Sequence, residues 1–112
     1  MFLYVEFWRA NKAWLSLTTE KRAQYVASLG PQIEALMAQG GIEILGWGEN
    51  SKETAKRASY DYFGLYRLSG ADKVAALEAA IQESGWYDYF DQVNAGGPAS
   101  APPDLLRALV TL

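Results

Sequence analysis

The stretch Phe2–Arg9 alternates at the two-residue period of a β-strand, and its two faces carry different chemistry. The odd-numbered face has no polar side chain before Arg9 and comprises Leu3, Val5 and Phe7. The even-numbered face places a carboxylate between two aromatic side chains that have polar handles, and comprises Tyr4, Glu6 and Trp8. A carboxylate inside a sheet requires a hydrogen-bond partner, a hydrated cavity or a proton. The sequence therefore predicts a pocket on the face that carries Glu6.

Composition excludes several classes of function. The 112 residues predict a single domain over residues 1–112, with a core over 1–95 and a linker and short helix over 96–112. A net charge of −3 without a basic run argues against a nucleic-acid partner. The chain has no cysteine and no histidine, which excludes disulfides, the common zinc sites, His-ligated haem and Ser-His-Asp catalysis. We therefore expect no metal and no organic cofactor.

No run of about eighteen apolar residues occurs, so we expect no membrane partner. The chain begins directly with the alternating strand rather than with a basic and apolar leader. On this basis we expect a cytoplasmic protein.

Periodicity and turn residues predict the order of the elements. Thr18 is expected to cap a helix of roughly twenty residues that kinks or breaks at Pro31 and ends at Gly40-Gly41. A second helix, with Ser69 and Asp72 as a capping box, is expected to stop at Gly85. The further expected elements are strands over Ile42–Trp47, Tyr60–Leu68 and Asp91–Ala95, a solvated loop over Glu49–Ser59, and a last helix over Leu105–Val110 capped by Asp104.

This order is β-α-β-β-α-β, the ferredoxin-like α+β pattern with a four-stranded antiparallel sheet. We expect the helices to cover the face with Leu3, Val5, Phe7, Phe63 and Leu65. The other face would then expose an aromatic surface formed by Tyr4, Glu6, Trp8, Tyr60, Tyr62 and Tyr66. An exposed aromatic surface of this size marks an interface or a ligand groove. Two such sheets facing each other would cover it, which predicts a homodimer.

Three stretches resemble darcynin-like proteins and related uncharacterised bacterial families: Lys12–Arg22, Gly46–Gly48 and Gly85–Ala95. The resemblance extends over nearly the whole chain and implies the dimeric α+β barrel superfamily. That superfamily includes cofactor-independent monooxygenases, muconolactone isomerases and haem-degrading enzymes. The most similar relatives have no assigned reaction, so the resemblance transfers no functional residue. Superfamily enzymes that rely on histidine differ from this chain, which has none.

The residues themselves favour an enzyme acting on a small planar or enolisable compound in the barrel cavity. In this hypothesis Glu6 moves a proton, while Tyr62, Tyr66 and Asn94 donate hydrogen bonds to the developing anion. A small aromatic ligand would contact Tyr4, Trp8, Trp47 and Tyr60. Isomerase, cyclase and monooxygenase chemistry all fit. The alternative is a non-catalytic homodimer that binds a small ligand or plays an accessory role.

Each candidate residue also has a structural interpretation. Glu6 could form an ion pair with Arg9, Arg67 or a lysine. The tyrosine row could pack within the sheet and the dimer, and Trp86 and Phe90, four residues apart, could form a packing pair. Asn94 and Gln92 could present amides to the cavity or line a wet barrel.

Overall fold

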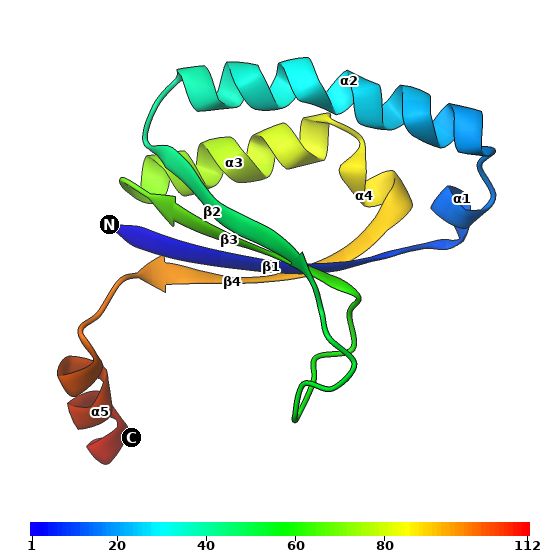
Figure 1. The fold of residues 1–112 in the computed structure, drawn as a ribbon. Helices are drawn as coiled ribbons and strands as arrows, with labels where there is room; N and C mark the ends of the chain where they lie inside the picture. Colours follow the sequence, from blue (N-terminus) through cyan, green and yellow to red (C-terminus); the bar gives the residue numbers. More distant parts are fainter.

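The computed structural model describes all 112 residues and has the expected βαββαβ order. Four antiparallel strands pair in the order β2-β3-β1-β4, and helices cover one face of this sheet (Figure 1). The fold is therefore a ferredoxin-like α+β fold. The strands are β1 (Phe2–Ala10), β2 (Ile42–Glu49), β3 (Tyr62–Leu68) and β4 (Phe90–Pro98). The helices are α1 (Lys12–Leu15), α2 (Thr19–Ala38), α3 (Ala71–Glu83), α4 (Trp86–Tyr89) and α5 (Pro102–Val110).

Helix α2 begins where the sequence predicts. The Thr18 side chain accepts a hydrogen bond from the backbone N–H of Lys21, which satisfies one of the free donors of the first turn. Of the kink or break expected at Pro31, the break is wrong, because α2 continues through Pro31 as one helix. The residue before a proline normally resists helical geometry because its Cβ meets the proline ring. Gly30 has no Cβ, so the helix can continue.

The sheet faces the helices with the opposite side from the one we expected. The buried residues of β1 and β3 include Tyr4, Glu6, Trp8, Tyr66 and Leu68, whereas Leu3 and Leu65 are exposed. The register confirms one shared face, because Tyr4 lies opposite Tyr66 and Trp8 opposite Tyr62. The expectation that the aliphatic face meets the helices is therefore wrong. Alternation separates two faces, but it does not say which of two largely apolar faces the helices cover.

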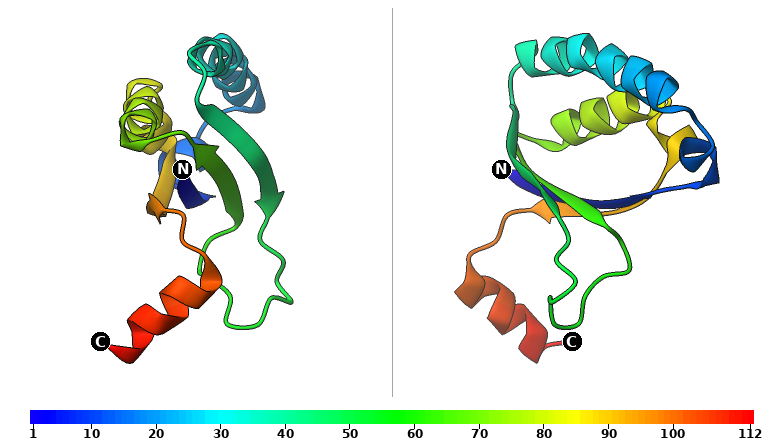
Figure 2. Two further views of the ribbon diagram at one scale, coloured as in Figure 1. Left: turned by 90° about the vertical axis from the view of Figure 1, so that its left-hand side faces the viewer. Right: turned by 45° about the vertical axis from the view of Figure 1, so that its right-hand side comes forward.

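The sheet face away from the helices, which we call the outer face, is largely apolar. Its apolar side chains are Leu3, Val5, Phe7, Phe63, Leu65 and Val93. Two ion pairs lie at its margins, Arg67 with Glu43 and Arg9 with Asp91. No helix of this chain covers the outer face (Figure 2).

Several boundaries differ from the sequence expectations. Helix α3 begins after Gly70 without a side-chain cap, so the capping box expected from Ser69 is wrong. Trp86–Tyr89 forms one helical turn before β4, which begins one residue earlier and ends three residues later than expected. Helix α5 begins at Pro102 after Ala101, with proline at its first positions, as suits a residue that lacks a backbone N–H.

Helix α5 projects away from the body on the side of the outer face (Figures 1 and 2). All of its residues are exposed, including Leu105, Leu106 and Leu109. The radius of gyration is accordingly 16.2 Å, larger than the roughly 13 Å typical of a compact domain of about 100 residues. None of the helices has the length and apolar character needed to cross a bilayer.

Replacing Thr18 by alanine should lower the free energy of unfolding by about 1 kcal/mol, because the Lys21 N–H loses its acceptor. Urea denaturation followed by circular dichroism measures this change. Thr19→Ala is the matched control: Thr19 is the first residue of α2 and alanine is the better helix former, so stability should be unchanged or slightly higher. Equal effects of the two substitutions would contradict the capping role.

Candidate active site

Glu6 lies in the middle of β1 on the face that the helices cover. Its neighbours across the sheet are Gly64 on β3 and Asn94 on β4. Only 4% of its surface is exposed. A carboxyl group this deeply buried requires compensation inside the protein.

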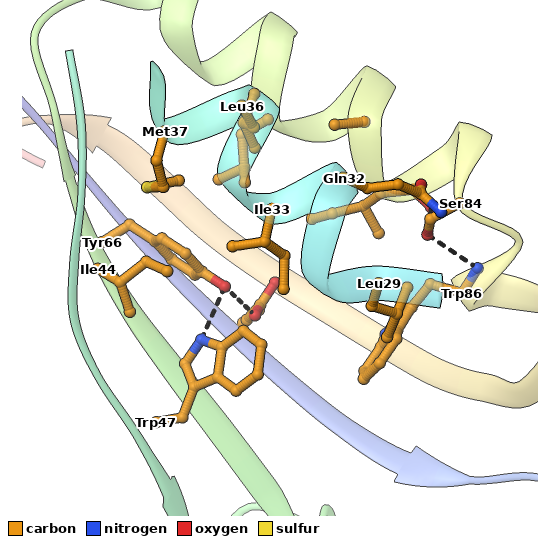
Figure 3. A pocket seen from close by; sticks show the side chains of 14 residues that line it. Leu29, Gln32, Ile33, Leu36, Met37, Ile44, Trp47, Tyr66, Ser84 and Trp86 are labelled. Atoms are coloured by element: carbon orange, nitrogen blue, oxygen red, sulfur yellow. Dashed lines mark hydrogen bonds between the residues drawn. The ribbon is translucent and has the colours of Figure 1, made fainter. Parts of the chain in front are cut away.

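Both oxygens of the Glu6 carboxyl group accept hydrogen bonds. The Tyr66 hydroxyl donates to Oε1 at 2.5 Å, and the Gln92 side-chain amide donates to Oε2 at 3.0 Å. Each of these two donors in turn accepts a hydrogen bond from a tryptophan. Trp47 Nε1 donates to the Tyr66 hydroxyl at 2.9 Å, and Trp86 Nε1 donates to the Gln92 carbonyl oxygen at 2.9 Å. Figure 3 shows the Trp47 and Tyr66 part of this network.

An indole N–H can only donate and an ionised carboxylate can only accept, which together fix the direction of both hydrogen-bond chains while Glu6 is ionised. Trp47 occupies the Tyr66 oxygen as an acceptor, so the Tyr66 proton points at Glu6. Trp86 occupies the amide oxygen of Gln92, so the amide nitrogen of Gln92 points at Glu6. Both network partners therefore offer protons to the carboxyl group. When Glu6 is itself protonated, the Gln92 amide nitrogen cannot accept from its O–H, and the Tyr66 oxygen can accept only if the Tyr66 hydroxyl proton turns away from Glu6.

The pKa of Glu6 is raised above the ordinary value of 4.5, chiefly because burial penalises the charged carboxylate. The hydrogen bonds from Tyr66 and Gln92 act in the opposite direction but do not cancel this effect. Burial and the neighbouring Glu6 carboxylate also raise the pKa of Tyr66, so the phenol stays protonated and remains a donor. The site thus holds a carboxyl group that gains and loses its proton more readily near neutral pH than an exposed glutamate does.

No ion pair neutralises Glu6. Arg9 pairs with Asp91, and Arg67 pairs with Glu43, both at the margins of the outer face. The ion-pair interpretation of Glu6 is therefore wrong.

A cavity adjoins Glu6 between the sheet and the helices. Its walls come mainly from apolar residues of α2 and α3, closed by Trp47 on β2 and Trp86 on α4 (Figure 3). Its volume is about 80 Å³. Since one water molecule needs roughly 10–15 Å³ by this kind of measure, the cavity admits several waters or one small organic molecule. The apolar lining residues include Leu29, Ile33, Leu36, Met37, Ile44, Leu77 and Ile81. We call it the Glu6 cavity.

Gly64 allows the carboxylate and an indole to lie side by side. A Cβ atom at this position would lie 2.8 Å from Glu6 Oε1 and 2.9 Å from Trp47 Cδ1. Both distances are shorter than van der Waals contact, so any larger residue would displace one of the two side chains. Gly64 thus fixes the distance between the proton-carrying group and the cavity wall.

The structure brings only some of the predicted site residues together. Glu6, Tyr66 and Trp47 border the Glu6 cavity. Trp8 is buried beneath it, where its ring packs edge-on against Trp47 and stacks on Tyr62. Trp8 and Tyr62 therefore support the wall and do not line the cavity.

The other three predicted residues lie elsewhere. Tyr4 and Asn94 line a separate, shallower groove beside α3, where the Tyr4 hydroxyl donates to Glu78 at 3.2 Å. Tyr60 precedes β3, and its ring contacts Phe7 and Arg9 near the outer face. The predicted alternation fails at Tyr60 because β3 begins only at Tyr62.

Sequence reasoning missed the helical half of the cavity and the second hydrogen-bond chain. Trp86 and Phe90 do stack, with ring centroids 4.1 Å apart, which confirms the expected packing pair. The additional role of Trp86 as a donor to Gln92 was not predicted. Gln92 lies diagonally from Glu6 across the β1–β4 pairing, a relationship that becomes visible only once the register is known. No cluster of acidic residues able to hold a metal ion occurs in the structure.

Substituting Gly64 by alanine should destabilise the protein by about 1–3 kcal/mol, because the added methyl group overpacks Glu6 against Trp47. Urea denaturation measures the loss, and the tryptophan emission of the folded state should change as Trp47 moves. Gly46→Ala on neighbouring β2 is the control, since a Cβ there meets no atom within 4 Å. A Gly64 variant as stable as the control would contradict the close approach.

Comparison with solved structures supports the fold. A chlorite dismutase variant from Candidatus Nitrospira defluvii matches 98% of this chain with a TM-score of 0.71 and 12% identity, and this chain spans only 47% of that protein. A dimeric ferredoxin-like protein of unknown function from Thermobifida fusca matches 88% of this chain and 90% of its own, with a TM-score of 0.56 and 14% identity. A hydroxynitrile lyase from Passiflora edulis matches 90% of this chain and 96% of its own, with a TM-score of 0.53 and 11% identity.

At such identities the likeness concerns the fold alone. The curated proteins include no significant sequence match. The more specific resemblance to darcynin-like proteins is not confirmed by these comparisons. A family model described as a family of unknown function, DUF6616, matches residues 1–112, and the chain belongs to this family.

Proposed function

We propose that this protein is a small-molecule enzyme in which Glu6 exchanges a proton with a compound bound in the Glu6 cavity, without a metal or organic cofactor. The observation that carries the proposal is the direction of the hydrogen bonds around Glu6. Because Tyr66 and Gln92 both donate to the carboxyl group, a proton on Glu6 can meet an acceptor on a bound ligand without either hydrogen bond reversing. Proton transfer between Glu6 and that ligand follows from this arrangement.

The cavity suits such a step. Its largely apolar lining surrounds a bound compound with few polar groups, which strengthens the electrostatic interaction of that compound with Glu6. The raised pKa of Glu6 brings its proton affinity closer to neutral pH, where general acid-base catalysis is most effective. Tyr66 and Gln92 hold the carboxyl group in place and act as positioning residues.

The same proton-transfer step is common to isomerases, cyclases and cofactor-independent oxygenases acting on planar or enolisable compounds. The fold itself is compatible with small-molecule enzymes, since two of the fold neighbours are a chlorite dismutase and a hydroxynitrile lyase. The sequence predicted a reaction in the space between the sheets of two protomers. The proposed site instead lies between the sheet and the helices of the same chain. Tyr62 and Asn94 have no catalytic role in this proposal, because neither lines the Glu6 cavity.

A second candidate, a non-catalytic binding protein, is favoured by one observation. The indole and hydroxyl donors that line the cavity already donate within the protein, as the hydrogen bonds of Trp47, Tyr66, Trp86 and Ser84 show. A developing oxyanion would therefore find few donors there. Under this alternative, Glu6 recognises a ligand and no bond in the ligand changes.

We also propose that two copies of the chain associate through their outer faces. Leu3, Leu65 and Val93 are 37–45% exposed on a sheet face that no helix of this chain covers. A contiguous apolar sheet face of this kind normally contacts a partner. The Thermobifida fusca neighbour is described as dimeric, which supports a second copy as that partner. The aliphatic face, and not the aromatic face, would then form the interface.

Glu6→Gln tests the proton-transfer proposal through stability as well as activity. Because the folded-state pKa of Glu6 is raised, the contribution of Glu6 to stability is fully present below its unfolded pKa near 4.5. It falls as the pH rises through that value and levels off above the folded pKa. Glutamine does not ionise, so the stability of the variant relative to the parent should increase as the pH rises from 4 to 8. This change is added to a pH-independent loss, because the NH2 group of glutamine replaces one of the two oxygens that accept from Tyr66 and Gln92, and any turnover should be lost. Urea titrations between pH 4 and 8 measure the difference.

Glu43→Gln is the matched control. Glu43 is an exposed carboxylate at the margin of the outer face, where an ion pair contributes little to stability. Carboxyl carbon NMR titration of the parent gives the pKa of Glu6 directly. A Glu6 pKa at or below 4.5, or a Glu6→Gln variant that becomes less stable relative to the parent as the pH rises, would refute the proposal.

Sedimentation velocity tests the outer-face dimer. At micromolar concentration the parent should sediment as a species of twice the 12.4 kDa chain mass. Leu65→Lys should shift it to monomer, because a charge on the outer face would be buried in the dimer. Val26→Lys is the control, since Val26 is an exposed apolar residue on α2 and its variant should stay dimeric. A monomeric parent, or equal effects of both variants, would contradict the interface.

A further inference from the structure

We infer that the Glu6 cavity selects small organic cations that carry a removable proton, such as protonated amines and iminium ions. This inference names the substrate class of the proposed function and rests on it. Three features of the cavity support it: the charge of its lining, the aromatic side chains in its walls, and the fact that its indole and hydroxyl groups already donate hydrogen bonds to other protein groups.

The lining contains one acid and no base. Glu6 is the sole ionisable carboxyl group among the fourteen lining residues, and neither lysine nor arginine is present. A bound anion would be repelled by the Glu6 carboxylate and would meet no compensating charge. A bound cation would supply the counter-ion that the buried carboxylate lacks within the protein.

Three aromatic side chains border the same space as the carboxylate. Trp47 lies on β2 and Tyr66 on the neighbouring strand β3, whereas Trp86 lies on α4, directly before β4 (Figure 3). Aromatic faces attract organic cations through the ring quadrupole, and tryptophan does so most strongly. Recognition of quaternary ammonium groups by aromatic cages follows this principle. The Glu6 cavity combines such walls with a carboxylate.

The hydrogen bonds that the lining residues already make also favour a cationic substrate for proton transfer. Removing a proton from a neutral compound leaves an anion, and the indole and hydroxyl groups of the lining already donate elsewhere. Removing a proton from a cation leaves a neutral product. The N–H bond, or the C–H bond beside an iminium carbon, breaks, and its proton joins a Glu6 oxygen. The bonding electron pair stays on the substrate and cancels its positive charge, so no net charge remains in the cavity.

The other titratable groups near Glu6 do not replace it in this role. They are the phenols of Tyr66 on β3, Tyr4 on β1 and Tyr87 on α4, and desolvation by burial raises the pKa of each. Helices α2 and α3 present no charged side chain to the cavity. Binding of a cation should therefore displace the Glu6 proton, and affinity should increase with pH until Glu6 is ionised in the free protein.

One other carboxylate could attract a cation. Glu78 lines the separate groove beside α3 together with Tyr4 and Asn94. Because this groove lies away from Trp47 and Trp86, binding there would not shift their indole signals. Glu78→Gln therefore serves as the matched control for Glu6→Gln.

Three probes of similar shape and different charge test the inference: tetramethylammonium, tert-butanol and pivalate. Binding is followed by the NMR signals of the Trp47 and Trp86 indole N–H groups. Isothermal titration calorimetry in buffers of different ionisation enthalpy counts the protons released. Tetramethylammonium should bind at least about tenfold more tightly than either other probe, and at pH values below the Glu6 pKa that NMR gives it should release protons on binding. Glu6→Gln should weaken its binding by about tenfold or more, while Glu78→Gln should leave it unchanged.

Several results would overturn the inference. These are tert-butanol or pivalate binding as tightly as tetramethylammonium, no binding of tetramethylammonium, or binding that depends on Glu78 instead of Glu6. The carboxyl NMR titration separates this failure from failure of the proposed function. A Glu6 pKa above 4.5 without cation binding refutes only the substrate class, whereas a Glu6 pKa at or below 4.5 refutes the proton-transfer proposal itself.

Discussion

The hydrogen bonds that converge on Glu6 cross the entire sheet. They run from Trp47 on β2 to Tyr66 on β3, then to Glu6 on β1 and to Gln92 on β4. This sequence of strands is the strand order of the sheet, β2-β3-β1-β4. The same side chains therefore connect all four strands on one face. A change of pairing register by one residue would turn these groups to the opposite face and leave the carboxylate without either donor.

This network also explains why the helices cover the aromatic face and not the aliphatic one. The aromatic rings contribute large apolar areas, and the buried indole and phenol groups find partners on the same face. No buried side-chain polar atom is left without a hydrogen bond. The outer face has only apolar groups at its centre, so it needs no such network and can meet another apolar surface directly.

Sequence patterns predicted the elements more successfully than the site. Alternation over Phe2–Arg9 and the Thr18 cap are local signals, and both correspond to observed structure. The choice of sheet face is not local, because it depends on whether Glu6 finds donors on β3 and β4. Strand alternation nevertheless identified Glu6, Tyr66 and Trp47 as candidates, since a carboxylate among aromatic residues needs a special environment. Gln92 was recognised only as a possible cavity amide, because its diagonal position relative to Glu6 depends on the β1–β4 register.

Glu6 opposes folding whenever it is ionised, and an apolar residue of similar size would avoid that cost. The cost is confined to electrostatics, because neither hydrogen-bond chain has to reverse when the proton leaves. Tyr66 and Gln92 donate to the ionised carboxylate, and they can continue to donate to the protonated group if its O–H points into the cavity. In that arrangement neither the Tyr66 nor the Gln92 side chain has to move when the proton leaves. A carboxyl group that changes charge without rearranging its surroundings is preorganised for proton transfer, since reorganisation adds little to the barrier.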